Sequence, residues 1–169
     1  MNRLNFFAGI LLLASVMCSV PATAEQSDNT PLEVALFPPL QLPSTEFGVK
    51  GLRLSLVGLN RELRGLDLGL LGNMTDVEFK GVAIAGLFNY NRGGSTVIGL
   101  QLAGIANINS GHSEVYGIQI AGFNKAGSVY GLQLGLVNMA TDLHGIQIGL
   151  VNINKGGPFH VTPIINVGF

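Results

Sequence analysis

Residues 49 to 152 alternate large apolar side chains with small or polar ones at a period of two, which is the pattern of β-strands. The pattern recurs in seven units that each open on a glycine, at steps of 14 to 18 residues. The clearest units read GLQLAGIA, GIQIAGFN, GLQLGLVN and GIQIGLVN, and they begin at Gly99, Gly117, Gly131 and Gly145. Such self-similarity predicts a sheet built from repeated strands.

The alternation gives each unit two different faces. One face carries an apolar residue, the opening glycine, a polar residue and a small residue, as in Val129, Gly131, Gln133 and Gly135. The other face is aliphatic along most of its length and begins with a long or amphipathic residue such as Lys50. The polar position of the first face holds, in chain order, Arg53, Asp67, Ala83, Gln101, Gln119, Gln133 and Gln147.

The spacing of the units favours an antiparallel up-and-down meander. Every step between opening glycines is an even number of residues, so strands folded back on one another keep each residue on its face. The first face also reads nearly the same in both directions. A fold centred on Ala140 pairs Gln133 with Gln147 and Gly135 with Gly145. Equivalent centres, such as Thr75, mostly fall in polar or glycine-bearing stretches that suit hairpin turns.

Two flanking segments are expected to add strands. Residues 34 to 42, VALFPPLQL, bring Gln41 in the same phase, and residues 160 to 169 end the chain. Pro38, Pro39 and Pro163 suit edge strands or bulges. We therefore predict an all-β domain, an antiparallel meander of eight or nine strands that closes into a small barrel. A β-solenoid is the alternative architecture.

The two architectures use the two faces differently. In a membrane-type barrel, the glycine and glutamine face fills a narrow lumen and the aliphatic face meets lipid. In a solenoid or a soluble barrel, the aliphatic face is the core, while glutamines and asparagines stack as ladders. Strands of about ten residues favour the membrane barrel, whereas short loops and the lack of tryptophan oppose it. The asparagines suited to such ladders are Asn107, Asn124, Asn138 and Asn152.

The polar row is the candidate functional feature, and we interpret it as a structural belt. Each glutamine amide offers a donor and an acceptor, so neighbours can bond one another across strands. Arg53 and Asp67 are adjacent in the row and are expected to pair. The belt comprises Gln101, Gln119, Gln133, Gln147, Arg53 and Asp67.

Composition and candidate chemistry narrow the function. The chain has 169 residues and a formal net charge of −1, so it lacks the positive field that attracts nucleic acid. His112, His144 and His160 have no metal-ligand spacing with one another, and the serines of the turns lack a base partner. We expect no catalytic residue, no metal and no cofactor, and we predict a non-enzymatic protein.

The N-terminus predicts export. Arg3 precedes an apolar run from Phe6 to about Val16, and the small-residue site Ala22-Thr23-Ala24 follows, which is the pattern of a signal peptide over residues 1 to 24. The one cysteine, Cys18, lies inside this segment and follows Met17 rather than a small residue, so lipidation is not expected. The mature chain then has a flexible segment over residues 25 to 33 and the β-repeat domain over residues 34 to 169.

The repeats GLQLGLVN and GIQIGLVN, with LFPPLQL before them and INKGGPFHVTPIINVGF after them, resemble a family of bacterial surface repeat proteins first recognised in spirochaetes. The resemblance covers residues 34 to 169 and carries over no catalytic residue. Arg53, Asp67 and Ala83 depart from the cleanest repeats, which have glutamine there. The resemblance implies location in the outer membrane or at the cell surface, with periplasm or secretion as the alternative.

Two functions fit these observations. The first is a structural envelope protein, an outer-membrane-type small β-barrel with membrane lipid as its partner. The second is a secreted or surface-displayed β-solenoid that acts as a binding or adhesion module through an unidentified surface ligand.

Overall fold

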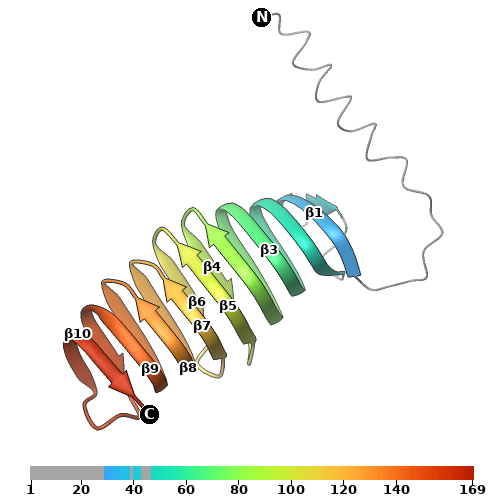
Figure 1. Ribbon diagram of the computed structural model, residues 1–169. Helices are drawn as coiled ribbons and strands as arrows, with labels where there is room; N and C mark the ends of the chain where they lie inside the picture. The colour runs from blue at the N-terminus through green and yellow to red at the C-terminus, as the bar shows by residue number, and fades with distance from the viewer. Residues whose placement is uncertain (1–28, 39, 43–46) are drawn as a thin grey trace, which may run out of the picture.

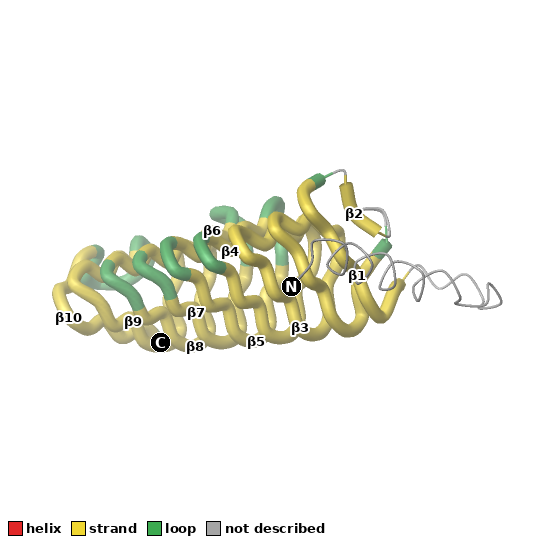
Figure 2. The backbone as a smooth tube through the Cα atoms, turned by 90° about the horizontal axis from the view of Figure 1, so that it is seen from above, coloured by secondary structure: helices red, strands yellow, loops and turns green. Residues whose placement is uncertain are grey.

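The computed structural model describes residues 29–38, 40–42 and 47–169, so the predicted signal peptide lies outside the described residues. The chain is all β and winds as a solenoid, of which one full turn is called a rung (Figures 1 and 2). The strands are β1 (Asn29–Phe37), β2 (Leu40–Leu42), β3 (Gly48–Ala85), β4 (Phe88–Asn91), β5 (Thr96–Ala103), β6 (Ala106–Asn109), β7 (Glu114–Ile120), β8 (Phe123–Leu134), β9 (Val137–Asn154) and β10 (Val161–Gly168).

Successive rungs pair in parallel and in register, so the predicted antiparallel meander and its closed barrel are wrong and the solenoid alternative is correct. Gly145 pairs with Gly131, not with Gly135. The near palindrome of the repeat explains the error, because Gln133 meets Gln147 whether the strands run parallel or antiparallel. Thr75, expected at a hairpin turn, lies inside β3 and pairs with Asn91 of β4.

Each rung contributes one strand to each of two layers. The first layer holds β5 and β7 with the matching parts of β3, β8 and β9. The second layer holds β4 and β6 with the remaining parts of the same long strands. Successive rungs stack along the axis of the solenoid, so each layer extends along its length (Figure 2).

The corners between the layers change which positions face inward. Val129 and Gln133 are buried in the first layer, Asn138 and Ala140 in the second, and Leu143 in the first layer of the next rung. Inward positions thus pass from odd to even numbers at one corner and return to odd numbers at the next. The two changes cancel, which gives this rung an even length without any hairpin.

The solenoid has the polar face inside and the aliphatic face outside. Ile146 and Ile148, expected in the core of a solenoid, are 40% and 39% exposed, whereas Gln147 between them is fully buried. The glycine and glutamine face therefore points inward, as expected for the barrel, although the architecture is the solenoid. A file of apolar side chains accompanies the polar interior and consists of Val49, Leu63, Phe79, Val97, Val115, Val129 and Leu143.

Antiparallel strands lie at both ends of the solenoid. At the C-terminal end, β10 pairs antiparallel with β9, and its register shifts around Pro163, as expected for an edge strand. At the N-terminal end, β2 pairs antiparallel with β1, which lies parallel to β3. The segment expected to be flexible, residues 25 to 33, overlaps β1, since residues 29 to 33 belong to this strand. Glu33 is buried there in register with Arg53.

Candidate functional site

A file of glutamines runs through the interior along the axis of the first layer. Each side-chain amide donates to the glutamine of the preceding rung: Gln119 to Gln101 at 2.9 Å, Gln133 to Gln119 at 2.8 Å and Gln147 to Gln133 at 2.7 Å. Asn166 of β10 continues the file by donating to Gln147 at 3.1 Å. The four glutamines of the proposed belt therefore lie together in one hydrogen-bonded row, and parallel stacking sets their spacing.

A file of asparagines runs beside it in the second layer, and its hydrogen bonds point the opposite way. Asn107 donates to Asn124 at 2.9 Å, Asn124 to Asn138 at 2.9 Å and Asn138 to Asn152 at 2.8 Å, each toward the C-terminus. Asn138 also donates to the Ile148 carbonyl at the corner of the next rung. Because the hydrogen bonds of the two files run in opposite directions, their amide dipoles oppose each other. This arrangement is electrostatically favourable for two polar rows in one narrow interior.

Toward the N-terminus, Ala83 interrupts the first file after Gln101, and charged residues occupy the two rungs before Ala83. Arg53 donates through Nε to Asp67 Oδ1 at 2.7 Å and through Nη2 to the second oxygen, a bidentate pair. Arg53 is fully buried and also donates to the Met74 carbonyl at 3.3 Å. Burial raises the pKa of the Asp67 carboxyl, against the opposing effect of the Arg53 guanidinium. The expected pair thus forms.

Glu33 of β1 is a third charged residue beside Arg53 and Asp67, and the sequence-based prediction did not include it. It is fully buried beside Arg53, and Oε2 accepts a 2.6 Å hydrogen bond from Asn60 Nδ2, while Oε1 has no partner. Burial raises the pKa of Glu33 to about 7, against opposing effects of Arg53 and Asn60. The signal was present in PLEVAL, whose alternation places Glu33 in phase with Gln41.

Stability is expected to fall as the pH rises toward neutrality. The pKa of Glu33 rises on folding from 4.5 to about 7, so the folded chain binds more protons between these values. Its contribution is fully present below pH 4.5 and is lost as the pH rises through 7, a loss on the order of 3 kcal/mol. Urea unfolding at pH 5 and at pH 8 measures the difference in the free energy of unfolding. Glu33→Gln should reduce the difference, and an unchanged difference in that variant would contradict the assignment.

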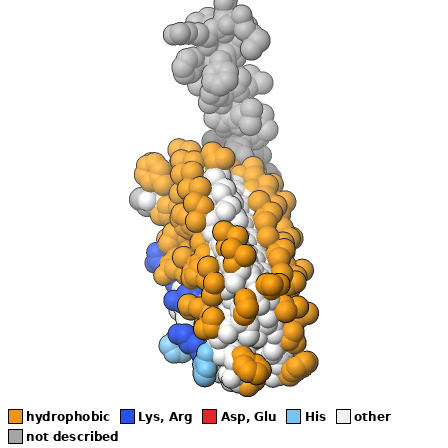
Figure 3. Space-filling model, turned by 90° about the vertical axis from the view of Figure 1, so that its left-hand side faces the viewer, with side chains coloured by type: hydrophobic (Ala, Val, Ile, Leu, Met, Phe, Trp, Pro, Cys, Tyr) orange, Lys and Arg blue, Asp and Glu red, His pale blue; other side chains and the backbone are white. Residues whose placement is uncertain are grey.

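The exterior of the first layer is a broad aliphatic surface, which we call the aliphatic face. Two outward positions of each strand form it, represented by Leu132 and Leu134 in one rung and by Ile146 and Ile148 in the next. Hydrophobic side chains gather in bands along the solenoid, with a band of backbone and other side chains between them (Figure 3). Beside this face, one corner presents more exposed side chains, which we call the apolar corner: Leu70 at 71%, Leu87 at 40%, Ile105 at 60%, Leu136 at 60% and Leu150 at 68%.

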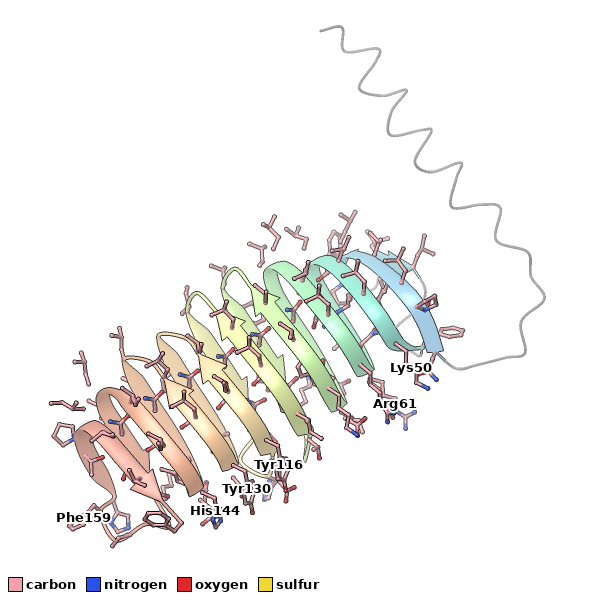
Figure 4. All side chains as sticks on the ribbon, in the orientation of Figure 1. Lys50, Arg61, Tyr116, Tyr130, His144 and Phe159 are labelled. Atoms are coloured by element: carbon pink, nitrogen blue, oxygen red, sulfur yellow. The ribbon has the colours of Figure 1, made fainter. Side chains whose placement is uncertain are left out.

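The opposite edge of the aliphatic face is polar. Lys50, Tyr116, Tyr130 and His144 lie along this edge, and Arg61 lies near Lys50 at its N-terminal end (Figure 4). The Tyr116 and Tyr130 rings stack with centroids 4.7 Å apart, and the His144 ring stacks on Tyr130 at 4.6 Å. In-register pairing of the strands imposes this stack, since it places equivalent side chains directly above one another.

The remaining candidate chemistry is sparse. A cavity of about 350 Å³ lies at the C-terminal end between β9 and β10, where Asp142, His144 and Phe159 contribute to its wall. Across residues 29–38, 40–42 and 47–169, no three His, Cys, Asp or Glu side chains are placed to hold a metal ion together. Within the same ranges, no helix has the length and apolarity to cross a membrane.

Comparison with models of known families, with curated proteins and with solved structures finds no match to this chain.

Proposed function

We propose that this protein is an exported, non-catalytic β-solenoid that docks on a lipid surface through its aliphatic face and apolar corner. The observation that carries the proposal is the exterior position of residues that would form the core of most soluble domains. The envelope location rests on the predicted signal peptide and on the resemblance to bacterial surface repeat proteins.

The size of the aliphatic face supports a docking role. Seven rungs spaced about 4.8 Å apart, each with two outward positions on the aliphatic face and one at the apolar corner spaced about 7 Å apart, give an apolar area on the order of 700 Å². Soluble monomers rarely expose a contiguous apolar patch larger than about 600 Å², and larger patches mark interaction surfaces. A single scattered leucine needs no such explanation, but exposed leucine and isoleucine at the same positions of successive rungs do.

The polar edge favours lipid as the partner. Tyrosine and lysine side chains combine an apolar stem or ring with a polar tip, and they concentrate where hydrocarbon meets headgroups. Tyr116 and Tyr130 border the aliphatic face on one side, whereas the apolar corner lies on the other. This order suits a solenoid lying on a membrane with the apolar corner deepest and the tyrosines at headgroup level.

Leu136→Glu is expected to weaken binding to phosphatidylcholine vesicles at least tenfold, because it places a charge in the part of the surface that inserts deepest. Leu136 is 60% exposed, so the substitution should leave folding intact. Thr141→Glu is the matched control, since Thr141 is exposed in the same rung at the opposite, polar corner. Vesicle cosedimentation measures both variants. Equal binding by Leu136→Glu and the unaltered chain would contradict the proposal.

A further inference from the structure

Two rows of opposite charge lie side by side along the polar edge of the aliphatic face. The inner row, next to the aliphatic side chains, contains Lys50, Arg64 and Lys80, and after Ile98 it continues with Tyr116, Tyr130 and His144. The outer row, two residues earlier in each strand and farther from the aliphatic face, contains Glu62, Glu78, Glu114 and Asp142.

The register of the strands fixes both rows. Glu78 pairs with Thr96, Thr96 with Glu114, Glu114 with Ser128, and Ser128 with Asp142. Because the strands rise about 3.3 Å per residue, positions two residues apart are about 7 Å apart on the same face. Moving outward from the aliphatic side chains, the surface is therefore first basic and aromatic and then acidic.

The two rows also contact each other. Glu78 pairs with Arg64 at 2.8 Å and with Lys80 at 2.9 Å, and the Tyr116 hydroxyl donates to Glu114 at 3.1 Å. The side chains of Arg64 and Lys80 remain 48% and 38% exposed, so these pairs are surface contacts of low energy that leave the cations accessible. Glu114 is likewise exposed.

We propose that the layered rows recognise zwitterionic phospholipid headgroups. Such a headgroup carries its phosphate next to the glycerol and its ammonium group farther out, so its charges follow the same order as the two rows with opposite sign. When the aliphatic face lies on the hydrocarbon, the inner row meets the phosphates and the outer row meets the ammonium groups. The proposal rests on the proposed lipid docking and names the headgroup that this docking selects.

The acidic row distinguishes this headgroup from a purely anionic one. A surface selected for anionic lipid would gain from basic residues alone, and Glu62 and Glu114 would repel it. An ammonium-bearing headgroup, by contrast, offers each of these carboxylates an ion-pair partner. Phosphatidylethanolamine and phosphatidylcholine vesicles are therefore the preferred targets.

The test compares cosedimentation of the mature protein with phosphatidylethanolamine/phosphatidylcholine vesicles and with vesicles containing phosphatidylglycerol. The unaltered protein is expected to bind the zwitterionic vesicles at least as well as the anionic ones. The double variant Glu62→Gln/Glu114→Gln is expected to bind zwitterionic vesicles threefold to tenfold more weakly and anionic vesicles more tightly. Glu78 is left in place because it bonds Arg64 and Lys80, and an unchanged urea midpoint verifies the fold of the variant.

Two results would overturn the inference. If the protein binds both vesicle types and the variant keeps the same preference as the unaltered chain, the headgroup assignment fails while lipid docking stands. If the unaltered protein binds neither vesicle type, the docking proposal itself fails and the headgroup assignment fails with it.

Discussion

Replacing Gly131 by alanine is expected to destabilise the protein by at least about 3 kcal/mol. Gly131 has φ of +147°, a conformation that side chains rarely adopt, and an added Cβ would lie 2.0 Å from the carbonyl oxygen of Gly117 in the preceding rung. Neither backbone can retreat, because in-register hydrogen bonds hold both strands. Urea unfolding followed by circular dichroism measures the loss.

Gly111→Ala is the matched control for this prediction. Gly111 lies in an exposed turn, and an added Cβ meets nothing within 4 Å. The control should change the free energy of unfolding by less than about 0.5 kcal/mol. A comparable loss from both substitutions would show that the stacked opening glycines Gly117, Gly131 and Gly145 do not limit how closely the rungs approach.

Asp67→Asn is expected to cost about 3 to 5 kcal/mol, since it replaces the carboxylate that pairs with the fully buried Arg53 guanidinium by a neutral amide. The double variant Arg53→Gln/Asp67→Gln should recover most of this loss. It removes both charges and places two glutamines where the later rungs already hold stacked glutamines, so each amide can bond its neighbour.

The same unfolding measurements compare the single and double variants. Recovery in the double variant is expected only if residues 53 and 67 stack in the way that Gln133 and Gln147 do. A double variant less stable than Asp67→Asn alone would contradict that equivalence, because the two substitutions would then act as independent losses.

Much of the local structure could be predicted from the sequence. The period of two identified the strands, and the polar position of each repeat identified the row of Gln101, Gln119, Gln133 and Gln147 that the structure brings together. Pairing of Arg53 with Asp67 followed from their adjacency in that row. These inferences succeed because repeated strands place equivalent residues on one face whichever way the strands run.

The direction of the strands could not be predicted in the same way. The palindrome around each glutamine satisfies parallel and antiparallel pairing alike, and the even repeat length arises from two corners that each shift the inward phase. The corner between Gly135 and Asn138 turns Asn138 inward, so the file of asparagines appeared only as a feature of the alternative fold. Sequence periodicity carries no signal for such a corner, because it describes strands and not the bends between them.

The inverted polarity of the solenoid has a physical basis in the same repeats. In this thin interior, amide side chains from both layers bond to their own copies one rung away, beside the file of buried apolar side chains. Gln133 and Asn138 do this, whereas Leu132 and Leu134 alternate with Gln133 along the strand and point outward. The aliphatic exterior thus accompanies the polar interior, and it forms the proposed docking surface.

Disulfide formation tests the parallel, in-register solenoid most directly, in a chain whose Cys18 is replaced by serine. Tyr130 and His144 are register partners, and neighbouring strands lie about 4.8 Å apart, within the Cα separation that a disulfide tolerates. Tyr130→Cys/His144→Cys should therefore cross-link under mild oxidation. An antiparallel fold centred on Ala140 would instead bring His144 beside Leu136. Cross-linking of Leu136→Cys/His144→Cys, with none in the first pair, would contradict the solenoid.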